Sequence, residues 1–119
     1  STKGFYRSYY SQELFDLIKP YFPDVNITAS YQVAYKDMAP HIDNSRKSNI
    51  IKRICYLYPL SVGGPDVKTI MWNGDEKIDE FKSQENEWFK LRIDHTHSVE
   101  GITEPPRICI SLRELEYVE

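Results

Sequence analysis

The sequence has only two cysteines, no long apolar run and no excess of positive charge. Cys55 and Cys109 each lie inside a short apolar segment, which favours reduced thiols in the core over a disulfide. Apolar runs of a few residues are too short to cross a bilayer. The net charge of -3 gives the chain no general attraction to nucleic acid or to a membrane surface. We therefore expect neither kind of partner.

A recognisable secretory signal is also missing, and we expect a cytoplasmic protein. The 119 residues are too few for two hydrophobic cores, which predicts one domain over residues 1–119. Nine tyrosines and two tryptophans favour a fold rich in strands. The sequence leaves the oligomeric state open.

One segment has the apolar spacing of a helix, which we expect over about residues 11–22. In "SQELFDLIKPYF", Leu14, Phe15 and Ile18 recur at helical spacing. Ser11 can cap the start of this helix, and Pro20 is expected to end it.

After the helix the chain is dominated by residues that favour strands. We expect strands in the segments "ITASYQVAYK", "NIIKRICYLYPL", "VKTIMW", "NEWFKLRI" and "RICISLREL". The segment "EKIDEFKSQ" fits either a short helical turn or a hairpin arm. One helix followed by about six short strands predicts a mainly β protein with an antiparallel double-sheet barrel of the jelly-roll kind, its core spanning about residues 27–115.

The three histidines of the chain all lie beside other potential metal ligands. His41 and Asp43 are separated by one residue, and residues i and i+2 of a strand point to the same face. His95 and His97 follow in "DHTHSVEG", and either could supply a second imidazole. Two imidazoles and one carboxylate on one face of a metal form the facial triad that suits non-haem Fe(II) and oxygen chemistry.

Arg107 begins the apolar segment "RICISLR", ten residues after His97. A guanidinium at this place could pair with a carboxylate inside a barrel. Tyr56 and Tyr58 share one face of the strand that follows the His41–Asp43 turn, and either phenol could hydrogen-bond the same anion.

The order and spacing of these segments resemble the 2-oxoglutarate- and Fe(II)-dependent dioxygenases, most closely their prolyl-hydroxylase-like branch. The resemblance covers about Tyr31 to Arg113 and is carried by "HIDN", "RICYLYPL", "VGGPD", "NEWFKL", "HSVEGI" and "PRICISLR". It implies a double-stranded β-helix in which the metal ligands are His41, Asp43 and His97.

The same resemblance assigns the cosubstrate site. Arg107 would bind the distal carboxylate of 2-oxoglutarate, with Tyr56 or Tyr58 beside it. Some relatives have serine two residues after this arginine, where the present sequence has Cys109. The second contact would then come from a tyrosine, or from Ser111 on the same face as Arg107.

The function implied is hydroxylation of a C–H bond with Fe(II), 2-oxoglutarate and O2, releasing succinate and CO2. The substrate would be a protein side chain such as proline, or a small molecule. A nucleobase demethylase of the same fold is an alternative, because Arg107 and Arg113 are six residues apart as in the repair branch, although the acidic chain argues against it. A catalytically silent, cupin-like metal-binding module is a further alternative.

Overall fold

The computed structural model describes residues 6–43 and 50–117, most of which lie in β-strands. One α-helix, α1, and one short 3-10 helix, η1, occur among these residues. In chain order the elements are β1 (Tyr6–Tyr10), α1 (Gln12–Ile18), η1 (Lys19–Tyr21), β2 (Ile27–Ala34), β3 (Met38–His41), β4 (Ile50–Ser61), β5 (Lys68–Asn73), β6 (Glu76–Phe81), β7 (Phe89–Arg92), β8 (His97–Glu100) and β9 (Arg107–Tyr117).

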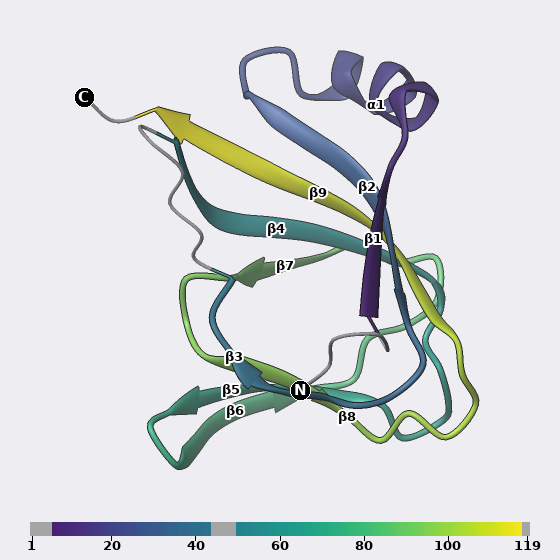
Figure 1. Ribbon diagram of the computed structural model, residues 1–119, viewed down its shortest axis with the longest axis vertical. Helices are drawn as coiled ribbons and strands as arrows, with labels where there is room; N and C mark the ends of the chain where they lie inside the picture. The colour runs from purple at the N-terminus through teal and green to yellow at the C-terminus, as the bar shows by residue number, and fades with distance from the viewer. Residues whose placement is uncertain (1–5, 44–49, 118–119) are drawn as a thin grey trace.

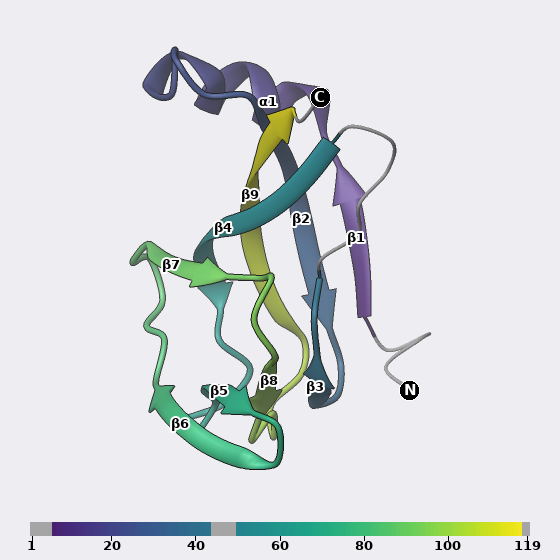
Figure 2. The same cartoon turned by 90° about the vertical axis from the view of Figure 1, so that its left-hand side faces the viewer.

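The strands form two antiparallel sheets, as the expected jelly roll requires. A five-stranded sheet has the order β1-β2-β9-β4-β7, and a four-stranded sheet has the order β3-β8-β5-β6. Figures 1 and 2 place α1 at one end of the molecule and the four-stranded sheet at the other. The mainly β, double-sheet fold expected from the sequence is therefore observed.

The space between the two sheets is filled mainly from the five-stranded sheet. Cys55 and Leu57 of β4 point into it because alternate residues of a strand share a face. They pack with Leu91, Ile93 and Cys109, and with the partly buried Met71 and Phe89. Both cysteines are free, as expected, and burial raises the pKa of each thiol.

The opposite face of the five-stranded sheet is covered by α1. Leu14 of the helix packs on Ala29 and Leu112, and all three are buried. The Ser11 hydroxyl caps the helix by accepting a hydrogen bond from the Leu14 amide at 3.2 Å, as expected. The α-helix ends at Ile18, two residues before Pro20, and Pro20 itself lies in η1. No helix among the described residues has the length and apolar character needed to cross a membrane.

Three short strands were not expected from the sequence. β1, β3 and β8 contain only four or five residues each, too few for period-two alternation to stand out. The ambiguous segment after Gly74 is a hairpin arm, β6, which pairs with β5. Of these elements, β3 and β8 lie side by side in the four-stranded sheet.

Candidate metal centre

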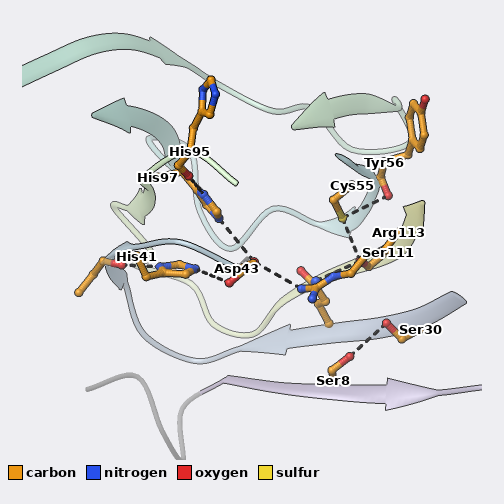
Figure 3. A network of polar contacts seen from close by, with 12 residues as sticks. Ser8, Ser30, His41, Asp43, Cys55, Tyr56, His95, His97, Ser111 and Arg113 are labelled. Carbon is orange, nitrogen blue, oxygen red and sulfur yellow. Dashed lines mark hydrogen bonds and ion pairs between the residues drawn. The ribbon is translucent and has the colours of Figure 1, made fainter. Parts of the chain in front are cut away.

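Three potential metal ligands converge where β3 and β8 meet. His41 ends β3, His97 begins β8, and these two residues are direct partners in the antiparallel register. Asp43 follows two residues after His41. One ligand atom from each of the three side chains lies within 4.8 Å of the other two, and Figure 3 shows them directed toward one another.

The Asp43 carboxylate lies between the two imidazoles. His41 Nε2 is 3.2 Å from Asp43 Oδ1, and His97 Nε2 is 3.6 Å from Asp43 Oδ2. The Asp43 amide donates a hydrogen bond to the Ile93 carbonyl at 2.8 Å, which anchors the chain just beyond β3. The carboxylate is therefore positioned by the backbone as well as by its side-chain contacts.

Backbone carbonyls set the orientation of both imidazoles. His41 Nδ1 is 2.6 Å from the Ala39 carbonyl, and His97 Nδ1 is 2.7 Å from the His95 carbonyl. A carbonyl can only accept, so each Nδ1 carries a hydrogen, and Nε2 is the atom left to contact Asp43 or, when it carries no proton, to bind a metal through its lone pair. Metal-binding histidines are held in this way by their outer hydrogen bonds. The donor set therefore fits a divalent metal ion.

The charges of the group also suit a cation. Burial works to raise the pKa of Asp43, but hydrogen bonds from His41 and His97 and the positive charge of Arg113 outweigh it, and the pKa falls well below its usual range. The hydrogen bond to Asp43 raises the pKa of His41, against the opposing effect of burial. Asp43 is thus an anion, and a bound metal would compete with the proton that His41 takes up.

His95, the alternative third ligand, does not belong to this group. Its side chain is 56% exposed and lies 3.9 Å from Asp94 Oδ1, and in Figure 3 it points away from Asp43. The contribution of His95 is its main-chain carbonyl, which orients His97. The structure brings together the three residues that the resemblance assigned and leaves His95 outside.

Replacing His97 and His95 in turn tests this difference. We expect His97→Ala to lose Fe(II) binding, because it removes one of three ligands. His95→Ala should bind Fe(II) with near wild-type affinity, because the carbonyl that orients His97 survives the substitution. Anaerobic calorimetric titration with Fe(II) measures both affinities. The reverse result, with His95 essential and His97 dispensable, would contradict the ligand set.

Arg107 is a buried cation in the same interior. Its exposed fraction is 5%, and burial lowers the pKa of the guanidinium. The guanidinium donates to the Val62 carbonyl at 3.0 Å and to Ser83 Oγ at 3.1 Å, and no carboxylate among the described residues pairs with it. A small cavity of about 40 Å³ is lined by Arg107 together with Asp43 and His97.

The double glycine of "VGGPD" lets the chain pass close to this arginine. A Cβ at Gly63 would lie 3.0 Å from the Arg107 Cβ, and Gly63 has a φ of +94°, which L side chains rarely adopt. The close approach allows the neighbouring Val62 carbonyl to accept from the guanidinium. The glycine is therefore part of how Arg107 is positioned.

The two tyrosines expected beside Arg107 lie elsewhere. Tyr56 packs against Phe22 on the helix-covered face and donates a hydrogen bond to Glu114 at 2.7 Å, and the Tyr58 ring contacts Trp88. The reason is the alternation of β4, which turns Cys55 and Leu57 inward and the tyrosines outward. This corrects the expectation that a tyrosine of β4 contacts the cosubstrate.

Ser111 does lie inside, on the same face of β9 as Arg107. Its hydroxyl is buried, accepts a hydrogen bond from Gln32 Nε2 at 3.0 Å and lies 3.1 Å from Cys55 Sγ. Its proposed contact with a cosubstrate stays a prediction.

Two residues near the site were not anticipated. Arg113 reaches Asp43, with Nη2 3.4 Å from Oδ2, and its position could have been inferred from the alternation that starts at Arg107. Tyr6 lines the same cavity, and burial raises the pKa of its phenol to about 12. Tyr6 lies on β1, a short edge strand for which the sequence carries no clear signal.

Comparison with known proteins identifies the fold. No family model and no curated protein matches the sequence. The structure is similar to the Cupin_2 domain of an XRE family transcriptional regulator from Enterobacter cloacae, with a TM-score of 0.53 and 10% identity over 97% of this chain and 99% of that chain. It is also similar to an RmlC-like cupin protein from Desulfovibrio desulfuricans, with a TM-score of 0.52 and 11% identity over 94% of this chain and 84% of that chain.

At 10% and 11% sequence identity, these similarities show only that the proteins share a fold. The chain has the jelly-roll fold of the cupins, which 2-oxoglutarate oxygenases also have. Within this fold it carries a His-Asp-His group that could hold a metal.

Proposed function

We propose that this chain is an Fe(II)- and 2-oxoglutarate-dependent oxygenase domain that hydroxylates a C–H bond. The observation that carries the proposal is one interior cavity lined by Asp43 and His97 of the metal group and by the buried, carboxylate-free Arg107. A domain that only held a metal would have no need of a buried cation without a carboxylate partner, because burying an arginine is costly without an anionic partner.

The residues divide into two tasks. His41 and His97 offer neutral Nε2 donors and Asp43 offers a carboxylate, which together leave open positions on a metal for other ligands. Arg107 would hold the distal carboxylate of 2-oxoglutarate through charge-assisted hydrogen bonds in a water-poor interior. The apolar side chains between the sheets, among them Leu91 and Val99, line the cavity and limit its contact with water.

Bound Fe(II) and 2-oxoglutarate would supply the oxidising chemistry. One oxygen atom of O2 enters the substrate C–H bond as a hydroxyl group, and the other enters the new carboxylate of succinate, while the 1-carboxylate of 2-oxoglutarate leaves as CO2. The substrate is proposed to be a protein side chain such as proline, or a small molecule. The net charge of -3 disfavours the nucleobase alternative.

A second candidate is a cupin-type metal-binding module without turnover. It is favoured by the size of the cavity, since about 40 Å³ holds only about three water molecules at roughly 10–15 Å³ each. A 2-oxoglutarate molecule would enter only if side chains at the cavity, such as Met38, moved. The existing hydrogen bonds of Arg107 to Val62 and Ser83 also partly satisfy the guanidinium without any ligand.

One experiment separates the two candidates. The protein is loaded anaerobically with Fe(II) and titrated with 2-oxoglutarate, and the metal-to-ligand absorption band is followed. An oxygenase should develop the band and, after O2 is admitted, release succinate that requires Fe(II). Fe(II) binding without the band would identify the silent module, and no Fe(II) binding would contradict both candidates.

A further inference from the structure

Thr69 has a buried hydroxyl whose hydrogen-bonding capacity is unused. The residue is 1% exposed, and Oγ1 has no hydrogen-bond partner among the described residues. Buried polar atoms are almost always paired in folded proteins, because an unpaired one loses its bonds to water without compensation. An isolated hydroxyl in the interior therefore points to a partner other than the described residues.

The place of Thr69 makes that partner a ligand of the cavity. Thr69 lies on β5 opposite Val99 of β8, while His97 lies opposite Met71, two residues further along β5. Two residues of a strand span about 7 Å, so Thr69 and His97 are separated by about that distance along the strand direction. Thr69, Arg107 and His97 line the same small cavity.

Thr69 also lies close to the end of the cavity where the guanidinium is held. Arg107 donates to Ser83, which follows β6, and Phe81 at the end of β6 is the direct partner of Thr69. The cavity is thus lined by metal ligands at one end. At its other end lie the Arg107 guanidinium and the unpaired Thr69 hydroxyl. Once side chains at the cavity such as Met38 have moved, a short diacid could reach from the metal group to Arg107 and Thr69.

We propose that Thr69 is a specificity-determining residue that donates a hydrogen bond to the ligand carboxylate held by Arg107; this rests on the proposed function. A carboxylate only accepts, so it can take the Thr69 proton as well as the guanidinium bonds. Cys109 lines the same cavity but offers only a weak S–H donor. Thr69 supplies a full hydroxyl donor from β5. A ligand that has no acceptor atom beside Thr69 would leave this donor unpaired and would therefore bind less well.

Two substitutions of Thr69 test the inference. Thr69→Val keeps the shape and removes the hydroxyl, and Thr69→Ser keeps the hydroxyl. Both proteins are measured without ligand, with glutarate in the absence of metal, and with Fe(II) and 2-oxoglutarate under anaerobic conditions. Glutarate keeps both carboxylates but lacks the keto oxygen, and without metal it cannot be held by metal coordination, so its binding reports on the Arg107–Thr69 end.

We expect Thr69→Val to unfold at the same or a higher temperature than wild type without ligand, because an unpaired buried hydroxyl is removed. It should bind both diacids about ten- to a hundredfold more weakly, the usual range for a hydrogen bond to a charged group. Thr69→Ser should retain most of the wild-type affinity.

The outcomes separate this inference from the proposed function. Equal diacid affinity in Thr69→Val and wild type would overturn the role of Thr69, and so would a large fall in the unfolding temperature of ligand-free Thr69→Val, which would reveal a structural partner. A third outcome is that glutarate binding depends on the Thr69 hydroxyl, but the protein does not bind 2-oxoglutarate with Fe(II). This outcome would support the proposed role of Thr69 and contradict the proposed oxygenase function. A wild-type protein that binds neither diacid would overturn both.

Discussion

His41→Ala and Asp43→Ala are expected to lose Fe(II) binding. Each removes one of three side chains whose ligand atoms lie within 4.8 Å of one another. The loss should exceed the roughly 10- to 100-fold cost of changing a residue that only supports a ligand. At an Fe(II) concentration about 100 times its dissociation constant, a metal that binds only the folded state stabilises it by about 2.7 kcal/mol. Wild type should show this gain in the free energy of unfolding, and neither variant should.

The two variants should differ in stability without metal. His41 is partly exposed at the end of β3, and its replacement removes little packing. Asp43 also pairs with Arg113, and Asp43→Ala leaves that partly buried cation without its carboxylate. Asp94→Ala is the matched control, because Asp94 pairs with Arg92 and lies outside the metal group. Wild-type Fe(II) affinity in either His41→Ala or Asp43→Ala would contradict the assigned site.

Arg107→Met should weaken 2-oxoglutarate binding far more than Fe(II) binding. Methionine approximates the volume of the buried side chain and removes the charge that the distal carboxylate would meet. A hydrogen bond to a charged group is worth about 1.5–3 kcal/mol, or roughly ten- to over a hundredfold in affinity. Arg107→Lys should recover part of the loss, because it restores the charge without the planar fork. Anaerobic titration of 2-oxoglutarate into each Fe(II)-loaded protein measures these affinities.

The choice of control for Arg107 depends on the structure. Arg113, six residues along β9, would serve as a neutral comparison from sequence alone, but it contacts the Asp43 carboxylate. Arg53 is suitable, because it is 45% exposed and pairs with Glu116 away from the cavity. Arg53→Ala should leave both affinities unchanged. If Arg107→Met binds 2-oxoglutarate as wild type does, the cosubstrate assignment is wrong and the silent metal module becomes the better description.

The long elements were predictable because their signals are local. The helix was recognised from Leu14 and its neighbours at helical spacing, and the Ser11 cap formed where the residue type favours one. β4 and β9 contain 12 and 11 residues, more than half of them apolar, and such runs are identified without knowledge of their partners. β1, β3 and β8 are stabilised by pairing with distant segments, which leaves little trace in their own composition.

By itself, the sequence determined which residues could form the candidate centre and the class of fold around them. The His41–Asp43 spacing, His97 and Arg107 are local features, and the number and length of the strands favoured a double-sheet barrel. Only the tertiary structure decided which face of β4 points inward, that Arg113 touches Asp43 and that Thr69 lines the cavity. Side chains along a strand alternate between its two faces, and the local sequence does not tell which set points inward. The register between distant strands decides this.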